Sequence, residues 1–503
     1  MNFLRLVMCV WCVFLGCQGN VLAADGADSP KNEAMGVATH FARKERWMSP
    51  WNPSLLIPQI AELHVGWIRD EIMWSEVEPE LGVYRLPEKT REWVDLANAH
   101  GLKIIACFSG QNPLYKDRFD PDAYARAAAW LARALDGKIH ALEILNEPMS
   151  YYAAYYGEGG MKGGNWWGLD NAGEVYPWVR RYVTLLNKAA DAIKAANPQM
   201  PVIGLGSLSP INFHQLKLGI SPRVDGITDH PYSFRTAPEV INFPDIIEFQ
   251  KLHGFAVADK EGSFVSLIER YREFSKQYNG PKQLWLTEWG HSTFREGAAG
   301  ENYLYSAFSE EAQARYTLRR FVECLGMKID VSILYAFMDD QREGGEFNCE
   351  NGFGVIRKDH SRKPVFAAVQ RVAKATIGFS RRDTLKVDIR PFSDRTEDRP
   401  PVWDGVSLPA LRQIRQYQFV DSRKRSVLAI WSCERLSDLN DRTADLEISG
   451  VPEGVTLEIL DLMTGSVSVP KISQKNGKIL LSKLRIPPYP LLITVASPHP
   501  STP

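Results

Sequence analysis

The chain has 503 residues, of which 45% are apolar and 24% are charged, and its formal net charge at pH 7 is −1. A chain of this length has room for a barrel of about 250 residues and a second domain. Because the charge is close to zero, the composition gives no reason to expect nucleic acid or an anionic membrane surface as a partner.

The first 23 residues have the pattern of a signal peptide for export. Arg5 precedes an uncharged run from Leu6 to Gly16, and Val21-Leu22-Ala23 offers small residues for cleavage. The run is too short for a membrane-spanning helix. A lipoprotein signal ending at Cys17 is the alternative, although Phe14 fits that pattern poorly. We therefore expect a periplasmic or extracellular protein whose mature chain has no spanning segment.

Four cysteines remain in the mature chain, namely Cys107, Cys324, Cys349 and Cys433. They are widely spaced and contain no CxxC pair, so they predict neither a metal site nor a disulfide framework. One bridge, between Cys324 and Cys349, is compatible with the count. We expect a monomer that uses no metal and no other cofactor.

From Ala34 onward, short apolar runs alternate with amphipathic helical stretches, which is typical of βα units and a parallel sheet. The expected strands are residues 35–40, 65–70, 103–109, 141–147, 202–207, 226–230, 283–288 and 331–337. Two helices have clear starts, one at Asp120-Pro121 and one at Ser309. Eight such units close a (β/α)8 TIM barrel, an α/β fold, which we expect within residues 24–378.

The sequence changes character beyond residue 378. Residues 381–410 are rich in Pro, Asp and Arg, which indicates a linker or an irregular edge. Short β runs follow at residues 415–420, 426–431, 444–448, 456–461, 478–481 and 491–495, and turns such as Asn476-Gly477 separate them. Residues 379–503 therefore predict a linker and a smaller β-sandwich domain. It contains no catalytic constellation, so we expect it to support the barrel, with carbohydrate binding as the alternative.

Two of the expected barrel strands end in a glutamate. The apolar run 141–145 is followed by Asn146-Glu147, and Pro148 then prevents the strand from continuing. The run 284–286 likewise leads into Thr287-Glu288. In α/β barrels the C-terminal ends of the strands form the face where catalytic residues collect. Two carboxylates at separate strand ends are the equipment of glycoside hydrolysis.

These motifs carry a resemblance to a known superfamily. Asn146-Glu147-Pro148 on the fourth strand and Thr287-Glu288-Trp289 on the seventh resemble the retaining (β/α)8 glycosidases of clan A, over about residues 34–375. The flanking sequence is most similar to glycoside hydrolase family 39, in its bacterial exopolysaccharide-cleaving branch. The resemblance implies that Glu147 is the acid/base and Glu288 the nucleophile, with carboxyl groups about 5–5.5 Å apart and a covalent glycosyl-enzyme.

Four further strand-end residues are candidates for the site. Asn146 is positioned to hydrogen-bond the 2-hydroxyl of the sugar. A buried Arg69 at the end of the second strand can hold the charge of Glu288, although a structural ion pair is the alternative. The resemblance implies that His230 and Tyr232, at the end of the sixth strand, bind the nucleophile and the substrate.

Other candidates for substrate contacts are His40 after the first strand and Trp289 after the nucleophile. The resembling family often has a Trp at the end of the eighth strand as the floor of the sugar site. Here the segment is 335–339, so Phe337 or Tyr335 has to serve. This departure bears on the identity of the substrate rather than on the type of reaction.

The loop after Pro148 is long and aromatic. Its rings are Tyr151, Tyr152, Tyr155, Tyr156, Trp166, Trp167, Tyr176 and Trp178. Aromatic faces suit the apolar faces of sugar rings, so we expect some of them, with Tyr151, Trp166 and Trp167 as candidates, to line a cleft for several sugar units. The alternative is that about half of them pack the loop onto the barrel.

The sequence thus predicts an exported retaining glycoside hydrolase that cleaves inside a polysaccharide by double displacement. An exo-acting β-glycosidase that releases single sugars is the alternative within the same chemistry. A carbohydrate-binding barrel without turnover is the alternative in another class, but the presence of both glutamates and Asn146 speaks against it. The expected partner is a polysaccharide or an oligosaccharide.

Overall fold

The computed structural model describes residues 29–42, 49–157, 168–170, 172–241, 247–296, 305–391, 414–433 and 442–496. The expected signal peptide with Cys17, the expected sugar contacts Trp166 and Trp167, and most of the expected linker lie outside the described residues. Within the described ranges, none of the helices combines the length and the apolar character that crossing a bilayer requires.

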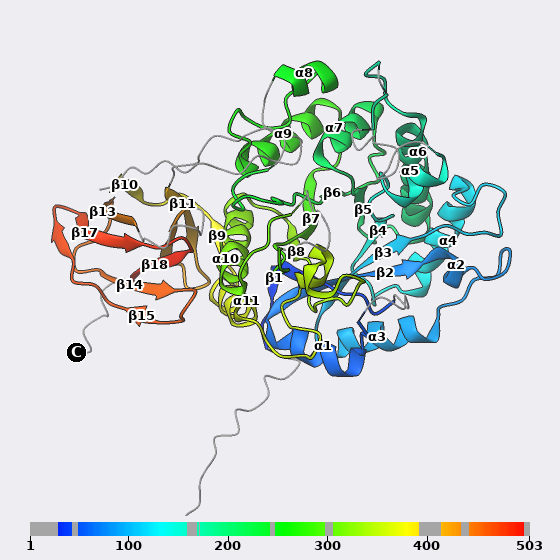
Figure 1. Cartoon of the computed structure of the whole chain (residues 1–503). Coiled ribbons are helices and arrows are strands. Elements are labelled where there is room, and N and C mark those ends of the chain that lie inside the picture. Colours follow the sequence, from blue (N-terminus) through cyan, green and yellow to red (C-terminus); the bar gives the residue numbers. More distant parts are fainter. Residues whose placement is uncertain are drawn as a thin grey trace, which may run out of the picture.

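Eight parallel strands close a barrel in sequence order, which confirms the fold predicted from the sequence (Figure 1). They are β1 (Asn32–Ala38), β2 (Val65–Met73), β3 (Lys103–Ser109), β4 (Ala141–Ile144), β5 (Val202–Leu205), β6 (Gly226–Asp229), β7 (Gln283–Trp289) and β8 (Val331–Leu334). Strands β4, β5 and β8 end two or three residues earlier than the apolar runs predict, because the chain leaves the sheet before those runs stop.

The connections between the strands supply the helical layer. Its helices are α1 (Pro53–Glu62), α2 (Trp74–Val77), α3 (Glu88–Ala99), α4 (Pro121–Ala134), α5 (Tyr151–Tyr155), α6 (Pro177–Ala196), α7 (Ser209–Leu218), α8 (Ile247–His253), α9 (Phe264–Gln277), α10 (Glu310–Gly326) and α11 (Pro364–Ala375), with the 3-10 turns η1 (Gly345–Phe347) and η2 (Cys349–Gly352) before α11. The predicted starts of α4 and α10 are confirmed, since Asp120 accepts from the amides of residues 122 and 123, and Ser309 accepts from that of residue 312.

The barrel interior is filled near the N-terminal ends of the strands. Trp67 from β2 and Trp285 from β7 meet edge to face there, with ring centroids 5.3 Å apart, and Ile105 from β3 belongs to the same cluster. Because side chains alternate along a strand, the residues two positions further on point into the barrel above this floor. On β2 and β7 these residues are Arg69 and Thr287. The apolar floor therefore places the polar side chains at the C-terminal mouth.

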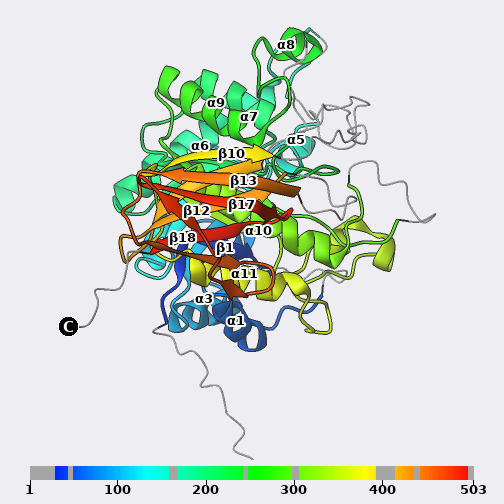
Figure 2. The same cartoon turned by 90° about the vertical axis from the view of Figure 1, so that its left-hand side faces the viewer.

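The C-terminal region forms two antiparallel sheets, which confirms the predicted β-sandwich (Figure 2). The first has the order β10-β13-β17-β16 and the second β15-β14-β18-β12-β11-β9. Their strands are β9 (Ser380–Arg381), β10 (Lys386–Pro391), β11 (Ile414–Val420), β12 (Ser426–Ser432), β13 (Arg442–Ser449), β14 (Thr456–Asp461), β15 (Val467–Ser468), β16 (Ser473–Lys475), β17 (Lys478–Ile486) and β18 (Leu491–Ala496).

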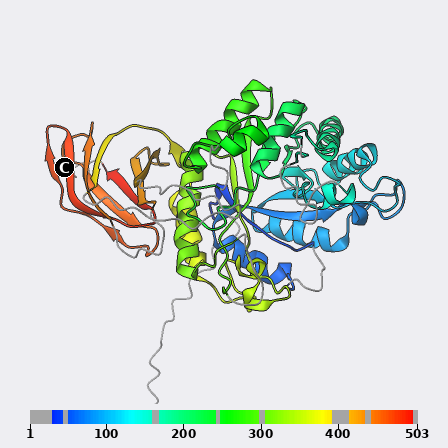
Figure 3. The ribbon, with the colours of Figure 1, turned by 45° about the horizontal axis from the view of Figure 1, so that its top comes forward.

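The β-sandwich packs against the barrel on the side of α10 and α11 (Figure 3). A Cβ atom built on Gly326 would lie only 2.3 Å from the ring of Tyr417, so only glycine lets β11 approach α10 this closely. On the same helix, Glu323 accepts from the hydroxyl of Tyr417 and pairs with Arg415 at 3.1 Å. The described part of the chain thus contains an interface with buried charge between the two domains.

The four cysteines among the described residues are free, so the bridge between Cys324 and Cys349 that the count allows is not formed. Cys324 is buried on α10, where the hydroxyl of Ser332 on β8 donates to its sulfur over 3.4 Å. Cys349 lies in the η2 turn of the last barrel loop. The sequence leaves the bridge open because it does not show that Cys324 faces inward onto the barrel.

Candidate active site

Arg69 makes hydrogen bonds to three of the polar side chains at the barrel mouth. Its Nε donates to Glu143 over 2.5 Å, its Nη1 to Glu288 over 2.7 Å, and its Nη2 to Asn146 over 2.7 Å. The side chain of Arg69 is 5% exposed and that of Glu143 is fully buried. Both readings of Arg69 from the sequence therefore hold together, since it binds the candidate nucleophile and forms a structural ion pair. The planar guanidinium suits this role because it fixes three directions at once.

A β-bulge decides which residues of β7 enter the barrel. Leu284 and Leu286 face the helices, and strict alternation would send Glu288 the same way. The pairing of β7 with β8 shifts register between Leu286 and Trp289. As a result Thr287 and Glu288 both point into the barrel, and Trp289 turns outward. Bulges near active sites re-aim side chains in this way.

The outward turn of Trp289 contradicts its prediction as a sugar contact. Its side chain is 1% exposed, its indole N–H donates to Ser332 over 2.8 Å, and its ring packs edge to face on Phe321 of α10. Trp289 is therefore part of the layer between barrel and helices. The prediction was wrong because the position of Trp289 directly after Glu288 does not show that the register shift in β7 turns it toward the helices.

The end of β4 also departs from regular geometry. Leu145 has φ of 60° and Glu147 has φ of 39°, a left-handed region that costs free energy for residues with a Cβ. The intervening Asn146 is held by Arg69, and its backbone N–H donates to the hydroxyl of Ser109. These twists let the consecutive side chains of Asn146 and Glu147 both reach the mouth of the barrel.

Glu288 lies in a pocket of positive charge and hydrogen-bond donors. Arg69 donates to its Oε1 over 2.7 Å, and the hydroxyl of Tyr232 donates to its Oε2 over 3.0 Å. Burial raises the pKa of this carboxyl, but His230, Arg69 and Tyr232 outweigh burial and hold the pKa below its ordinary value. The contacts expected between Arg69, Tyr232 and Glu288 are confirmed. These contacts thus favour the ionised form of Glu288.

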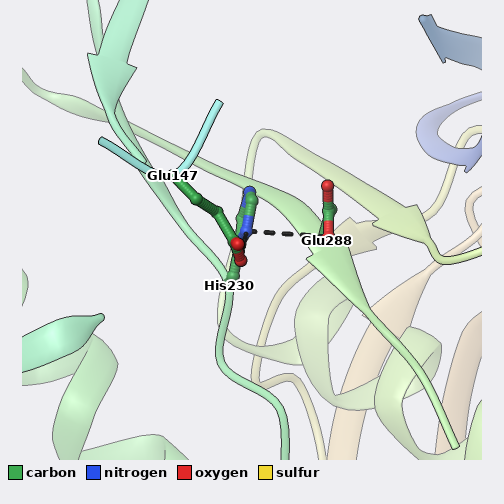
Figure 4. Close-up of side chains that lie close together, drawn as sticks. All are labelled: Glu147, His230 and Glu288. Carbon is green, nitrogen blue, oxygen red and sulfur yellow. Dashed lines mark hydrogen bonds and ion pairs between the residues drawn. The ribbon is translucent and has the colours of Figure 1, made fainter. Parts of the chain in front are cut away.

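His230 joins the two glutamates (Figure 4). Its Nδ1 lies 2.9 Å from Oε1 of Glu147 and 3.7 Å from Oε2 of Glu288, and its Nε2 lies 3.1 Å from the hydroxyl of Thr287. Burial opposes a charge on the ring, yet Glu288 and Glu147 together raise the pKa of His230 above its ordinary value. The main contact of His230 is therefore to Glu147, whereas the resemblance implies one to the nucleophile.

The carboxylates of Glu147 and Glu288 are close together. One ligand atom from each of Glu147, His230 and Glu288 lies within 4.8 Å of the others. Such a triplet has the size of a cation site, but both nitrogens of His230 are already engaged by Glu147 and Thr287. The cationic Arg69 also occupies one oxygen of Glu288. The nitrogens of His230 and one oxygen of Glu288 are therefore already engaged by side chains of the barrel mouth.

A wide groove leads away from the mouth beside Asn146. Its volume is about 880 Å³, which is toward the upper end of ordinary ligand pockets. Phe119 and Tyr155 line it together with Tyr151, whose side chain is 73% exposed. Of the other described aromatic residues of this loop, Tyr152 and Trp178 are buried and pack it onto the barrel. The described part of the loop thus has both exposed and buried rings, and their contact with sugar stays a prediction.

The fold is shared with solved glycoside hydrolases. A family 39 glycoside hydrolase from the gut symbiont Bacteroides cellulosilyticus WH2 is 17% identical to this chain and matches it with a TM-score of 0.63. The match covers 92% of this chain and 81% of the other chain. A glucosidase from Croceicoccus marinus is 13% identical to this chain and matches it with a TM-score of 0.51. That match covers 94% of this chain and 98% of the glucosidase chain. No family model and no curated protein matches the sequence. At these identities the likeness shows the fold, so the function has to be argued from the site.

The first and eighth strands supply the wall next to Glu288. His40 is mostly buried, and its Nε2 lies 3.2 Å from the hydroxyl of Tyr335. His40 is also close enough to Glu288 to contribute to its lowered pKa. Phe337 is fully buried among the residues between barrel and helices, so its expected role as the floor of the sugar site is contradicted. Tyr335, the other residue considered there, faces the interior instead.

The last barrel loop brings a third carboxylate near the pair, which the sequence reveals only as a polar stretch. Glu350 lies on η2, with its Oε2 3.7 Å from Nη2 of Arg342. Burial raises the pKa of Glu350, Arg342 lowers it, and Glu147 and Glu288 raise it further, so the pKa lies above its ordinary value. The last barrel loop therefore adds further charged groups near Glu147 and Glu288.

Two supporting residues were missed by sequence reasoning. Glu143 accepts from Arg69 and, over 2.9 Å, from the hydroxyl of Thr287, and Thr287 in turn contacts His230. A signal for Glu143 exists in the sequence, since a charged residue inside the short apolar strand 141–145 needs a buried partner. Thr287 gives no such signal, because threonine is common in strands.

Proposed function

We propose that the protein is a retaining glycoside hydrolase in which Glu288 is the nucleophile and Glu147 the general acid and base. The observation that carries this proposal is the pair of carboxylates at the ends of β4 and β7, in which one oxygen of Glu147 lies within 4.8 Å of one oxygen of Glu288. Retaining enzymes have carboxyl groups about 5–5.5 Å apart, whereas inverting enzymes need about 6.5–9.5 Å to admit a water molecule. The short spacing supports the retaining reaction.

In the first step, an oxygen of Glu288 attacks the anomeric carbon of the bound sugar. Glu147 gives its proton to the glycosidic oxygen as the bond from that oxygen to the anomeric carbon breaks, and a glycosyl ester on Glu288 results. Arg69 and Tyr232 keep Glu288 ionised and oriented. Asn146, which Arg69 holds in place, is the candidate donor to the 2-hydroxyl of the sugar.

In the second step, Glu147 is ionised and takes a proton from water. The hydroxide attacks the anomeric carbon, the ester bond to Glu288 breaks, and the sugar leaves with its original configuration. His230 supports this exchange because its ring lies between the two carboxylates and stabilises negative charge on either of them. The side chain of Glu147 is 31% exposed, which leaves it open to the leaving group and to water.

We propose a polysaccharide as the substrate and cleavage inside the chain as the mode of action. An open groove of about 880 Å³ with exposed aromatic surface suits several sugar units better than one. The release of single sugars from an end is the second candidate, because the Croceicoccus marinus neighbour is a glucosidase. The N-terminal sequence pattern supports export to the place where such polymers occur.

The test is incubation of the full chain with a panel of polysaccharides and aryl glycosides. Product lengths are measured by chromatography, and the configuration at the new reducing end is measured by NMR before mutarotation. We expect mixed oligosaccharides with retained configuration from at least one polymer, and no products with Glu288→Gln. Monosaccharides alone would establish the exo mode, inverted products would refute the two-step mechanism, and binding without products would leave a carbohydrate-binding barrel.

A further inference from the structure

The segment that carries His230 and Tyr232 continues along residues 233–241 before α8. In this stretch Ser233, Glu239 and Val240 are almost fully buried. The hydroxyl of Ser233 donates to the carbonyl of Val240 over 2.7 Å, and the carbonyl of Glu239 accepts from the amide of residue 264 over 2.9 Å. The segment is therefore a folded loop, and its position sets where Tyr232 meets Glu288.

Two arginines of α10 hold this loop from the barrel side. Arg320 donates from Nη2 to the hydroxyl of Ser233 over 2.9 Å. Arg319 donates from Nε to Oε1 of Glu239 over 2.8 Å, and its Nη2 bonds the other oxygen. Glu239 and Arg319 are fully buried, so their charges depend on each other and on any further donor.

The further donor comes from the other domain. Trp431 lies on β12 of the β-sandwich, is fully buried, and donates its indole N–H to Oε1 of Glu239 over 2.7 Å. The contacts of Arg415 and Tyr417 described above reach Glu323 on α10, and Arg371 of α11 donates to the carbonyl of Met463 over 2.7 Å. Among the described residues, the bond from Trp431 is thus a direct polar link from the β-sandwich to the loop that carries Tyr232.

We propose that the β-sandwich is part of the catalytic unit, with Trp431 acting as a positioning residue for Tyr232 and His230 through Glu239. A buried carboxylate that loses a donor finds no water to replace it, so Glu239 and its loop shift to restore contacts. Tyr232 is seven residues from Glu239 and bonds the nucleophile, which makes it sensitive to such a shift. This inference rests on the proposed function for its kinetic readout only.

The test replaces Trp431 with Phe in the full chain, which removes the N–H and keeps most of the ring. Trp74→Phe is the matched control, because the indole of Trp74 donates over 2.8 Å to the buried carboxylate of Glu78 in the α2 region. We expect kcat/KM on an aryl glycoside to fall about tenfold in Trp431→Phe, which corresponds to one lost hydrogen bond, and to stay within about twofold in Trp74→Phe. If the two variants have similar melting temperatures, a difference in stability does not explain the difference in their kcat/KM.

A double-mutant cycle tests the route. If Trp431 acts through Tyr232, the substitution Trp431→Phe has little further effect in a Tyr232→Phe background. Fully additive losses, or an unchanged kcat/KM in Trp431→Phe, overturn the proposal. Ser233→Ala, which removes the bonds to Arg320 and to the carbonyl of Val240, is the second variant if Trp431→Phe does not fold. A normal kcat/KM for it would mean that the loop does not control Tyr232, which also overturns the proposal.

A second readout does not depend on turnover. The carboxylates of Glu288 and Glu147 raise the pKa of His230, so a displaced loop lowers it. We expect the NMR titration of His230, assigned with His230→Gln, to move to lower pH in Trp431→Phe and not in Trp74→Phe. If the wild type hydrolyses no glycoside, the proposed function fails, and this titration alone decides whether Trp431 positions the loop. An unchanged titration refutes that role.

Discussion

The ends of β4 and β7 each deliver one glutamate, but into different surroundings. The side chain of Glu288 is 11% exposed, with Arg69 and Tyr232 bonded to its two oxygens. The side chain of Glu147 is 31% exposed, and it contacts His230. A nucleophile has to stay ionised and keep its direction, whereas an acid/base has to meet the leaving group and then water. The difference in enclosure therefore supports the proposed roles, which sequence order alone only suggests.

The largest loss of activity is expected for Glu288, which is the more enclosed of the two glutamates. Glu288→Gln removes the attacking oxygen and takes one of two anionic partners from both Arg69 and His230. We expect kcat to fall by about 10⁴- to 10⁶-fold on every substrate, as for other enzymes that lose a nucleophile or its base. Steady-state kinetics on an aryl glycoside measure this loss. A residual rate above about 1% of wild type would mean that Glu288 is not the nucleophile.

Glu147→Ala is expected to be selective, because it removes proton transfer and leaves Glu288 in place. On a glycan, which has a poor leaving group, kcat should fall by about 10²- to 10⁴-fold. An activated aryl glycoside hardly needs the proton, so it should still form the glycosyl ester on Glu288 in a burst. Azide, which needs no general base, should then restore turnover and give a glycosyl azide of retained configuration.

The same experiment can reverse the assignment. In Glu288→Ala, azide would attack the sugar from the side that the nucleophile has vacated and give the inverted azide. An inverted azide from Glu147→Ala would therefore mean that the two glutamates have exchanged roles. NMR of the purified azide distinguishes these outcomes.

Tyr232→Phe tests why Glu288 remains ionised. The hydroxyl of Tyr232 helps to hold the pKa of Glu288 below its ordinary value, so its removal raises that pKa. Because the ionised form is the reactive one, the acid limb of kcat/KM moves to higher pH. A hydrogen bond to a charged group contributes about 1.5 kcal/mol, which corresponds to a shift of about 1 pH unit. A shift to lower pH would contradict the role given to Tyr232.

The sequence predicts the barrel well because the apolar runs and the helix starts depend only on residues that are close together in the sequence. The strands β3 and β2 begin where the pattern places them, and Asp120 and Ser309 cap their helices as expected. The glutamates were predictable because a carboxylate at the end of an apolar strand needs a special reason to be there. Arg69 was predictable because it too is a charged residue at the end of an apolar strand.

What the sequence could not supply is geometry that depends on other strands. The bulge in β7 arises from its pairing with β8, and it turns Trp289 away from the site. Phe337 is buried because the chain leaves the barrel after β8 ends at Leu334, three residues earlier than the apolar run predicts. The link from Trp431 to Glu239 joins residues 192 positions apart, and no local pattern announces it.

The smallest effect is expected for the exposed groove on the side of Glu147. Tyr151 begins α5, four residues after Glu147, and is 73% exposed on the wall of the groove. The aromatic residue next to Glu288, Trp289, is buried. If sugar units beyond the cleaved bond stack on Tyr151, Tyr151→Ala should raise KM for a polysaccharide up to about tenfold, since an aromatic contact contributes about 0.5–1.5 kcal/mol. The same variant should keep its KM for an aryl monosaccharide, which does not reach along the groove. Val467→Ala, an exposed apolar change on β15 of the β-sandwich, controls for general surface effects. Equal KM changes on the long and the short substrate would mean that Tyr151 does not distinguish them, and the argument for internal cleavage would then lose the exposed ring on which it depends.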